Sequence, residues 1–444
     1  MAVALLAPLV LPGWVSCGRT LLESADPPAG GTSARTDWPM YGRDVSRTGF
    51  DPNETAISAT SAARLAPRWQ ADIGMGDSPP SGAPTVAGGR IFVGSSRPDG
   101  DNFFAFDAAT GQALWKANVG HHAPYDFDVG LGATPAVSGS VVVVGGGDAA
   151  YYGLDAATGT IRWRHPMDVG PSGFTWCSPL VANGRAYVGM SSQGDNPSVR
   201  GEVRALDVAT GALLTTRYFV PEGERGAGLW NSPSLSPDGR VLAVATGEDF
   251  NGYDGPFNRA LVTLDPTTLE VLQANKQGAP DQDLDWGTTP VFFKDRLGHT
   301  LVGANHKNGV FYTYEADQVA AGPLWQRNLG VGVGMMPAYD PGRGTGGTLF
   351  IVGDNGQLFA VDPATGTDRW PPVAVGFMYG NMALADGLVL VSTGGSVVIL
   401  DEGTGAVLRV LTPADPGPSY SGPVVAGGFV YWLSGPKLDA WRLP

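Results

Sequence analysis

Acidic and imidazole side chains at close spacing mark two stretches of the chain that could hold a metal ion. Asp281, Asp283 and Asp285 alternate as the first ligands of a calcium-binding loop do, but the later glutamate of such a loop does not follow. His121 and His122, with aspartates a few residues on, suit a transition metal, although adjacent histidines in a loop are usually solvated. The motifs Gly-x-Ser-x-Gly and His-Glu-x-x-His and the phosphate-binding loop are absent from the sequence, so hydrolytic and phosphoryl-transfer chemistry of those kinds is not indicated.

The charge of the chain restricts its partners. Its 444 residues carry a formal net charge of −14 at pH 7. Nucleic acids and anionic lipid surfaces require clustered Lys and Arg, so neither is an expected partner. The acidity indicates either ordinary solubility or carboxylate-lined cation sites. The covalent haem attachment pattern Cys-x-x-Cys-His is missing, and we therefore expect no haem bound by that route.

A repeated pattern must position any functional residues. Each copy starts with a Pro-containing apolar strand, passes a Gly turn into a Val/Tyr/Phe strand, and reaches an Asp strand that is closed by Thr-Gly. Neighbouring copies begin roughly 40 to 57 residues apart, the range for a blade of four strands in a β-propeller. Eight copies are found, at residues 81–115, 132–163, 177–214, 231–272, 288–325, 336–370, 382–408 and 422–444.

The two ends of the repeat region predict how the ring closes. The last copy stops after its third strand at Trp441, while residues 65–69 form an isolated outer strand before the first copy. Pairing that strand with the last blade removes two open sheet edges at once. The sequence thus predicts an all-β fold, an eight-bladed β-propeller of four-stranded blades closed by an N-terminal strand. We interpret the recurring Asp-x-x-Thr-Gly as a tight hairpin and the Trp that follows as packing between blades.

The first residues resemble an export signal. Residues 1–17 are apolar and too short for a membrane span, and Val15-Ser16-Cys17 resembles a bacterial lipoprotein cleavage box, although Trp14 stands where an aliphatic residue is expected. Lipidation at Cys17, simple secretion and an uncleaved segment all stay open. We therefore divide the chain into a leader with a flexible tether, residues 1–37, and a propeller, residues 38–444. The expected location is the bacterial periplasm, the cell envelope or the exterior, with membrane attachment only through a lipid at Cys17.

Several loops of the third to sixth copies resemble one family. The runs WPMYGRDVSRTGFDPNETAI, GAGLWNSPSL, VATGEDFN, DLDWGTTPV and NHKNGVFYTYE occur in the order found in pyrroloquinoline-quinone (PQQ) dehydrogenases. The chain is most similar to the polyvinyl-alcohol-dehydrogenase-like branch. The resemblance extends over nearly everything from Trp38 onward. The repeat itself is shared with non-catalytic propellers, including the outer-membrane assembly scaffold.

The resemblance implies roles for four residues around a quinone. Trp230 would form the flat surface on which the planar cofactor stacks, with Trp286 as a second cofactor contact. Lys307 would lie beside the reactive carbonyl as a polarising cation. Asp285 would be the general base that accepts the proton of the alcohol. From the residues alone, Asp285 could equally cap a turn, Lys307 could be a solvated hairpin lysine, and Trp230 could be packing.

The resemblance also implies a calcium ion, held by Glu248 and by Asp195 or Asn196. Here the sequence departs from the family, since Glu248 replaces the usual Asn after Thr-Gly, and Asp195 or Asn196 stands for the usual Glu. The vicinal cysteine pair that many relatives hold over the cofactor is missing, and the lone Cys177 cannot replace it.

Two functions follow from these observations. The first is PQQ- and calcium-dependent oxidation of a small-molecule or polymeric alcohol, with electrons passed to an external acceptor. The second is a propeller without cofactor that works as an envelope scaffold or binding module. The ordered loops favour the first, and the missing cysteines and altered calcium ligands favour the second.

Overall fold

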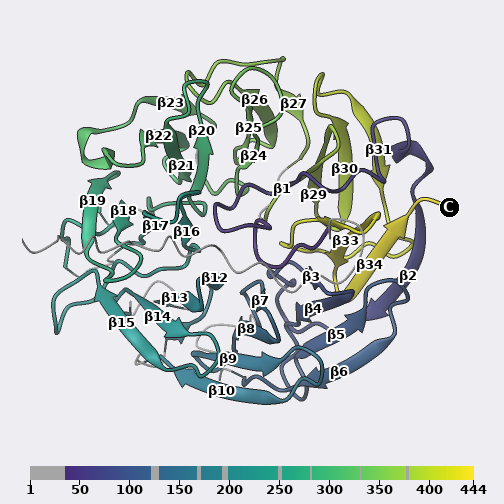
Figure 1. Cartoon of the computed structure of the whole chain (residues 1–444), viewed down its shortest axis with the longest axis horizontal. Coiled ribbons are helices and arrows are strands. Elements are labelled where there is room, and N and C mark those ends of the chain that lie inside the picture. The colour runs from purple at the N-terminus through teal and green to yellow at the C-terminus, as the bar shows by residue number, and fades with distance from the viewer. Residues whose placement is uncertain are drawn as a thin grey trace, which may run out of the picture. The chain divides into compact units, whose positions relative to one another are not determined.

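Eight sheets of mainly antiparallel strands are arranged in a ring, in a computed structural model that describes residues 36–121, 130–167, 172–192, 199–248, 253–280, 283–330, 332–376 and 380–444 (Figure 1). Blades 1 to 4 contain the strands β3–β6 (Thr85–Ala87, Arg90–Gly94, Phe103–Asp107, Ala113–Ala117), β7–β10 (Ala136–Ser138, Val141–Gly145, Ala150–Asp155, Ile161–Pro166), β12–β15 (Leu180–Ala182, Arg185–Ser192, Glu202–Asp207, Leu213–Tyr218) and β16–β19 (Ser234–Leu235, Leu242–Ala245, Ala260–Leu264, Val271–Lys276).

Blades 5 to 8 complete the ring. They contain β20–β23 (Val291–Lys294, Thr300–His306, Val310–Glu315, Trp325–Asn328), β24–β27 (Ala338–Asp340, Thr348–Val352, Gln357–Val361, Val373–Ala374), β28–β31 (Ala383–Ala385, Leu388–Thr393, Ser396–Asp401, Val407–Leu411) and β32–β34 (Val424–Ala426, Phe429–Ser434, Lys437–Arg442). Two short strands extend these sheets, β1 (Phe50–Asp51) beside β28 and β11 (Gly173–Phe174) beside β13. Two 3-10 helices, η1 (Ala62–Arg64) and η2 (Val319–Ala321), are the helical elements of the described residues. The predicted eight-bladed propeller is confirmed.

The ring is closed by a strand from the start of the chain. Strand β2 (Ala66–Asp72) pairs antiparallel with β34, from Ala66 opposite Arg442 to Asp72 opposite Lys437. This pairing supplies the fourth strand of blade 8 and removes the open edges of both segments. The closure predicted from residues 65–69 is confirmed, and the strand extends three residues further than predicted.

Outer-strand tryptophans link five of the blades to the next one. Trp163 donates its indole N–H to the Val208 carbonyl at 2.9 Å, and its ring covers Gly211. A Cβ on Gly211 would lie 2.6 Å from that ring, so only glycine fits there. The same bond from indole to the residue after the turn aspartate recurs at Trp69, Trp115, Trp325 and Trp370. These tryptophans are packing residues, as the repeat predicts.

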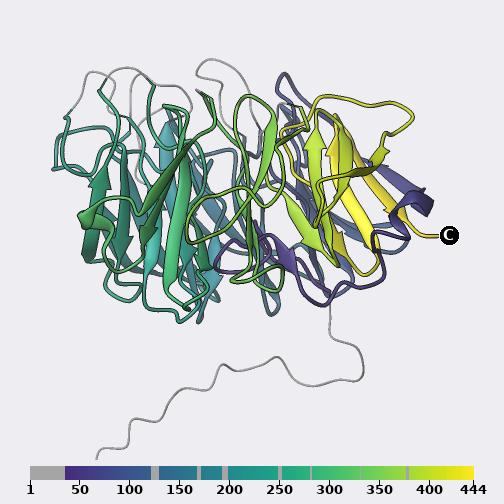
Figure 2. The same ribbon diagram turned by 90° about the horizontal axis from the view of Figure 1, so that it is seen from above.

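Residues 38–54, which we call the threading segment, contact every blade in turn (purple in Figures 1 and 2). The segment lies toward one end of the ring, the lower side of Figure 2. Backbone hydrogen bonds to blades 1, 2, 4, 5, 6 and 7 join Trp38 to Val86, Pro39 to Val137, Val45 to Leu235, Ser46 to Phe292, Thr48 to Tyr339 and Gly49 to Leu384. The side chains of Arg47 and Glu54 reach blades 3 and 8. One segment therefore ties together blades that are distant in sequence.

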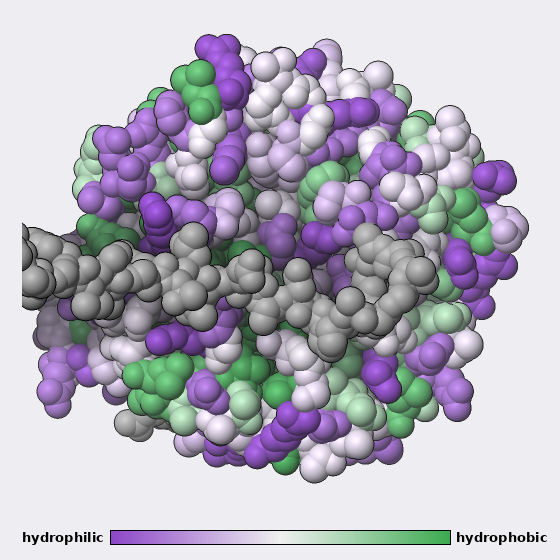
Figure 3. Space-filling view, viewed as in Figure 1, coloured by the Kyte–Doolittle hydropathy of each residue, from purple (hydrophilic) through white to green (hydrophobic). Residues whose placement is uncertain are grey.

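Burial separates the inner strands of the blades from their outer strands. Strand β8, with the sequence Val-Val-Val-Val-Gly, is buried throughout, whereas β6 is mostly exposed. Around the rim of the face shown in Figure 3, hydrophobic and hydrophilic residues are interspersed. Among the described residues, no helix is long and apolar enough to cross a membrane.

Candidate functional site

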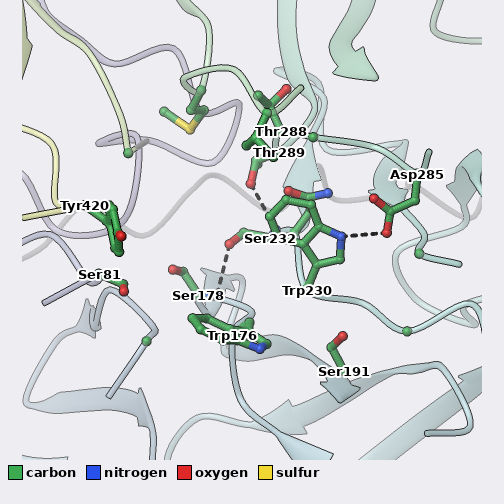
Figure 4. Close-up of a pocket in the computed structure, with 18 of the residues that line it drawn as sticks. Ser81, Trp176, Ser178, Ser191, Trp230, Ser232, Asp285, Thr288, Thr289 and Tyr420 are labelled. Atoms are coloured by element: carbon green, nitrogen blue, oxygen red, sulfur yellow. Dashed lines mark hydrogen bonds between the residues drawn. The ribbon is translucent and has the colours of Figure 1, made fainter. Parts of the chain in front are cut away.

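A cavity of about 530 Å³ lies where loops from many blades converge. This volume is typical of a small-molecule or cofactor site. Polar and aromatic side chains of blades 3 to 5, including Trp176, Trp230 and Asp285, form one wall. Ser81 and Tyr420 lie across the cavity from Trp230 and Asp285 (Figure 4). Tyr41 of the threading segment also lines the cavity.

Asp285 is the centre of the charged wall. It lies directly before blade 5 and is only 4% exposed. The indole N–H of Trp230 donates to its Oδ2 at 3.0 Å (Figure 4), and Lys307 Nζ lies 2.8 Å from its Oδ1. The Lys307 backbone N–H donates to the Asp285 carbonyl at 2.8 Å, so the two residues are held by the main chain as well. The structure thus brings together three residues that the sequence predicted.

Lys307 is the cation of this group. Its Nζ contacts Asp283 Oδ1 at 2.5 Å and lies 5.0 Å from the centroid of the Trp230 ring. Burial alone would lower the pKa of Lys307, but the nearby carboxylates of Asp285 and Asp283 outweigh it and raise the pKa. Lys307 is therefore charged at neutral pH. It is not a solvated hairpin lysine, since its side chain is only 15% exposed.

Burial makes Asp285 a stronger base than an ordinary aspartate. Removal from water raises the pKa of its carboxyl, and Lys307 and the Trp230 N–H oppose that effect without cancelling it. The side chain is bonded to two cavity-lining residues, Trp230 and Lys307. A carboxylate in this position is within reach of a proton on a molecule in the cavity.

A relay of hydroxyl groups stiffens the wall beneath Trp230. In blades 2 to 5 a Ser or Thr stands directly before the proline that precedes the first strand. Its hydroxyl oxygen accepts a hydrogen bond of 2.8 to 3.0 Å from a backbone N–H of the previous blade, and these residues are Thr134, Ser178, Ser232 and Thr289. The links from Ser178 to Ser232 and on to Thr289 are seen in Figure 4. Hydroxyls are needed here because each buried N–H would otherwise lack a partner. The relay fixes the spacing of blades 1 to 5 at the cavity.

Glu248, predicted as a metal ligand, lines the cavity but is already paired with a cation. Its Oε2 lies 3.2 Å from Nη1 of Arg259, and both side chains are 1% exposed. Asp195 and Asn196, the other predicted ligands, lie outside the described residues, as do Asp281 and His122. Within the described ranges, no group of three or more His, Cys, Asp or Glu side chains could hold a metal ion. Of the predicted calcium ligands, the structure thus describes Glu248 alone, and that carboxylate is held by Arg259.

Trp286, predicted as a cofactor contact, does not line the cavity. Its ring is fully buried and packs edge-on against His306 and Tyr312, at centroid distances of 5.2 and 5.8 Å. Successive side chains of an extended segment point to opposite sides, so Asp285 facing the cavity sends Trp286 into blade 5. The structure therefore does not place Trp286 at the cavity, contrary to the prediction. His121 is also apart from the cavity wall, with its Nε2 2.8 Å from the Gly100 carbonyl.

The cavity wall places an aromatic face beside a positive charge, an arrangement suited to a planar ligand. Trp230 offers a half-buried aromatic face and Lys307 offers a positive charge next to it. The backbone can approach a ligand in the cavity closely, because six lining residues are glycines: Gly132, Gly228, Gly247, Gly287, Gly334 and Gly380. At Gly247 an added Cβ would lie 3.1 Å from Asp285 Oδ2, crowding the catalytic candidate. Aromatic faces with a few polar groups are the usual means of holding a planar cofactor.

Two lining residues were missed by reasoning from the sequence. Trp176 lines the cavity, and its indole N–H donates to the Ser192 carbonyl at 3.1 Å. It stands two residues before Ser178, as Trp230 stands two residues before Ser232, so the repeat register contained the signal. Tyr41 could not be found this way, because no repeat fixes the path of the threading segment.

Comparison with known proteins gives the same fold. The family described as "Outer membrane protein assembly factor BamB" (PQQ_2) matches residues 53–250, 102–308 and 314–432. Polyvinylalcohol dehydrogenase of a Pseudomonas species is 21% identical over 341 residues, 68% of this chain and 52% of the relative. BamB of Yersinia pestis is 24% identical over 323 residues, 71% of this chain and 70% of the relative. The chain thus spans about half the length of the polyvinylalcohol dehydrogenase it matches.

A solved structure agrees with the architecture. The quinohemoprotein alcohol dehydrogenase ADHIIG of Pseudomonas putida HK5 superposes with a TM-score of 0.75 at 16% identity, over 92% of this chain and 80% of that one. At this level of identity the likeness concerns the fold alone.

Proposed function

Since this chain belongs to the PQQ_2 family of propellers, we propose that it is a quinone-dependent alcohol dehydrogenase that uses PQQ and passes electrons to an external acceptor. The substrate is a small-molecule or polymeric alcohol. One observation carries the proposal: the buried Asp285 is bonded on the cavity wall to both Trp230 and Lys307. This combines a base, an aromatic face and a fixed cation in one place.

Each of the three residues has a distinct part in this chemistry. When bound, the quinone supplies a sink for the two electrons released as an alcohol becomes a carbonyl compound. Trp230 holds the planar ring system through its indole face. Lys307 stabilises negative charge that develops beside it. Asp285 accepts the hydroxyl proton, and its raised pKa makes it a better acceptor than an exposed aspartate.

The test is dye-linked alcohol oxidation by the purified protein supplied with PQQ. The Asp285→Asn variant keeps the shape of the side chain but cannot accept the proton, so we expect turnover to fall by about 100-fold or more. Asp207→Asn is the matched control, because Asp207 caps a Thr-Gly turn through Thr210 and should leave turnover unchanged. Equal turnover of wild type and Asp285→Asn would overturn the role of Asp285. Absence of turnover in wild type with a range of alcohols would overturn the activity.

A second candidate is a binding module without redox activity. It is favoured by the match to BamB, which covers 71% of this chain and 70% of the relative, a larger share of the relative than the polyvinylalcohol dehydrogenase match covers. In that case the cavity would bind a ligand or protein segment and would not change PQQ absorbance. The PQQ titration described in the Discussion separates the two candidates.

Export is part of the proposal. The relatives include an outer membrane assembly factor, and residues 15–17 resemble a lipoprotein cleavage box. We propose the periplasm, the envelope or the exterior as its location, and a lipid at Cys17 as the sole route of any membrane attachment. Fractionation of cells that express the full chain tests this. Recovery of the protein with intact Met1 in the cytosol would contradict it.

A further inference from the structure

One carboxylate of the cavity wall, that of Glu248, belongs to a buried ion pair. Glu248 Oε2 and Arg259 Nη1 are 3.2 Å apart, and each side chain is 1% exposed. The Arg259 backbone N–H donates to the Gly247 carbonyl at 2.9 Å, and Ala227 N–H donates to the Glu248 carbonyl at 2.9 Å. Gly247 itself lies against Asp285. The pair is thus built into the loop that faces the proposed quinone.

Further charges hold Arg259 in place. Its Nη2 contacts Asp254 at 2.8 Å, and Lys276 Nζ contacts the same carboxylate at 2.5 Å. Arg259 adopts a left-handed backbone conformation, with φ of 53°, which is unfavourable for an L-residue other than glycine. A residue that tolerates such strain is held by its surroundings. The guanidinium is therefore a fixed charge next to Glu248, which lines the cavity.

The carboxylates on the described cavity wall already have cations. Glu248 is paired with Arg259, while Asp283 and Asp285 share Lys307. Calcium requires six to eight oxygen ligands and several negative charges at about 2.3–2.6 Å. A divalent ion at Glu248 would be repelled by a guanidinium that is about 3 Å from the same carboxylate. Displacing Arg259 instead would leave a second buried charge without its partner.

We propose that Arg259 holds the carboxylate of Glu248 in place of a divalent metal, so that this site binds its cofactor without calcium. The inference rests on the proposed function for the identity of the cofactor. Arginine is not deprotonated in proteins and is not removed by a chelator, so its charge is permanent. Arg259 is accordingly a positioning residue, since it acts on the cavity through Glu248 and Gly247.

The first test is PQQ binding followed by tryptophan fluorescence, in EDTA and in millimolar calcium. We expect the two dissociation constants to agree within about twofold. Affinity at least tenfold weaker in EDTA would overturn the inference while supporting the proposed function. Absence of binding in both conditions would overturn the proposed function, and the calcium titration below would then decide the inference alone.

The second test is the thermal shift caused by calcium without PQQ. In wild type, about 5 mM CaCl₂ should raise the Tm by less than about 1 °C. In Arg259→Gln the carboxylate of Glu248 loses this cation, so calcium should raise the Tm by several degrees. Glu248→Gln combined with Arg259→Gln should lose that gain. Arg240→Gln is the control, because Arg240 is 84% exposed and 3.7 Å from Asp238.

Two outcomes overturn the inference even if Arg259→Gln fails to fold. A calcium-dependent rise of several degrees in wild type that disappears in Glu248→Gln would assign Glu248 as a metal ligand. Stoichiometric calcium binding by wild type in equilibrium dialysis, lost in Glu248→Gln, would have the same meaning. Absence of a calcium response of wild type in both assays supports the proposal that Arg259 holds the carboxylate of Glu248.

Discussion

Replacing Lys307 by methionine should destabilise the propeller through Asp285. Methionine retains the apolar stem of the lysine but removes the charge, so Asp285, which is 4% exposed, keeps only the N–H of Trp230 as a described side-chain partner. Breaking a fully buried ion pair costs about 3–5 kcal/mol, because it leaves an uncompensated charge in the interior. Lys307 is 15% exposed and Asp283 is 57% exposed, so we take the lower value, about 3 kcal/mol.

This free energy corresponds to a measurable change of Tm. The entropy of unfolding is about 2 cal/mol/K per residue, which for a propeller of roughly 400 residues gives about 0.8 kcal/mol/K. A loss of about 3 kcal/mol therefore lowers the Tm by about 4 °C, as measured by differential scanning calorimetry. Adding Asp285→Asn should restore most of the loss, since the double variant contains neither charge.

An exposed ion pair provides the control. Lys116 is 67% exposed and lies 2.9 Å from Asp101, so Lys116→Met should change stability by less than about 1 kcal/mol. A Tm for Lys307→Met within about 1 °C of wild type, equal to this control, would refute the argument that Asp285 depends on Lys307 for its charge. Failure of Asp285→Asn to rescue the variant would also refute it.

Two further predictions concern ring closure and pH. Trp69→Ala should lower the free energy of unfolding by about 3 kcal/mol, because the indole N–H donates to the Ala108 carbonyl and the ring packs 5.9 Å from the Tyr431 ring. Thermal unfolding measures this loss, and an unchanged Tm would contradict the closure. Burial and the neighbouring Asp340 raise the pKa of Glu402 to about 9, so its protonated form is favoured in the folded state. The stability that this group contributes is complete below about pH 4.5 and is lost as the pH rises toward 9. The Tm of wild type should therefore fall more steeply between pH 6 and 9 than the Tm of Glu402→Gln. Parallel curves of Tm against pH would contradict this.

The repeat made the fold predictable. Asp-x-x-Thr-Gly and the following tryptophan recur with the blade, and both depend on local geometry, so eight blades could be counted. Closure by the strand before the first copy followed from the unpaired edge of the last copy. The roles of Trp230, Asp285 and Lys307 were predicted from the family resemblance of the loops that carry them.

Other features depend on contacts that no local pattern encodes. Trp286 was assigned to the cofactor because it adjoins Asp285, but alternation along an extended segment turns it into the core. Arg259 gave no signal in the sequence, because its pairing with Glu248 spans 11 residues and depends on the exact path of the hairpin between β17 and β18. The threading segment likewise contacts six blades through its backbone, and backbone hydrogen bonds are largely independent of side-chain identity.

The central claim is that a planar quinone binds against Trp230, and titration of the purified protein with PQQ tests it most directly. We expect saturable quenching of tryptophan fluorescence, a shift in PQQ absorbance and a stoichiometry of about one. Trp230→Leu should weaken binding by at least about tenfold, since one stacking face is lost, while Trp325→Phe, which packs between blades 5 and 6, should not. Absence of saturable binding up to about 100 μM PQQ, or an affinity unchanged in Trp230→Leu, would contradict the claim.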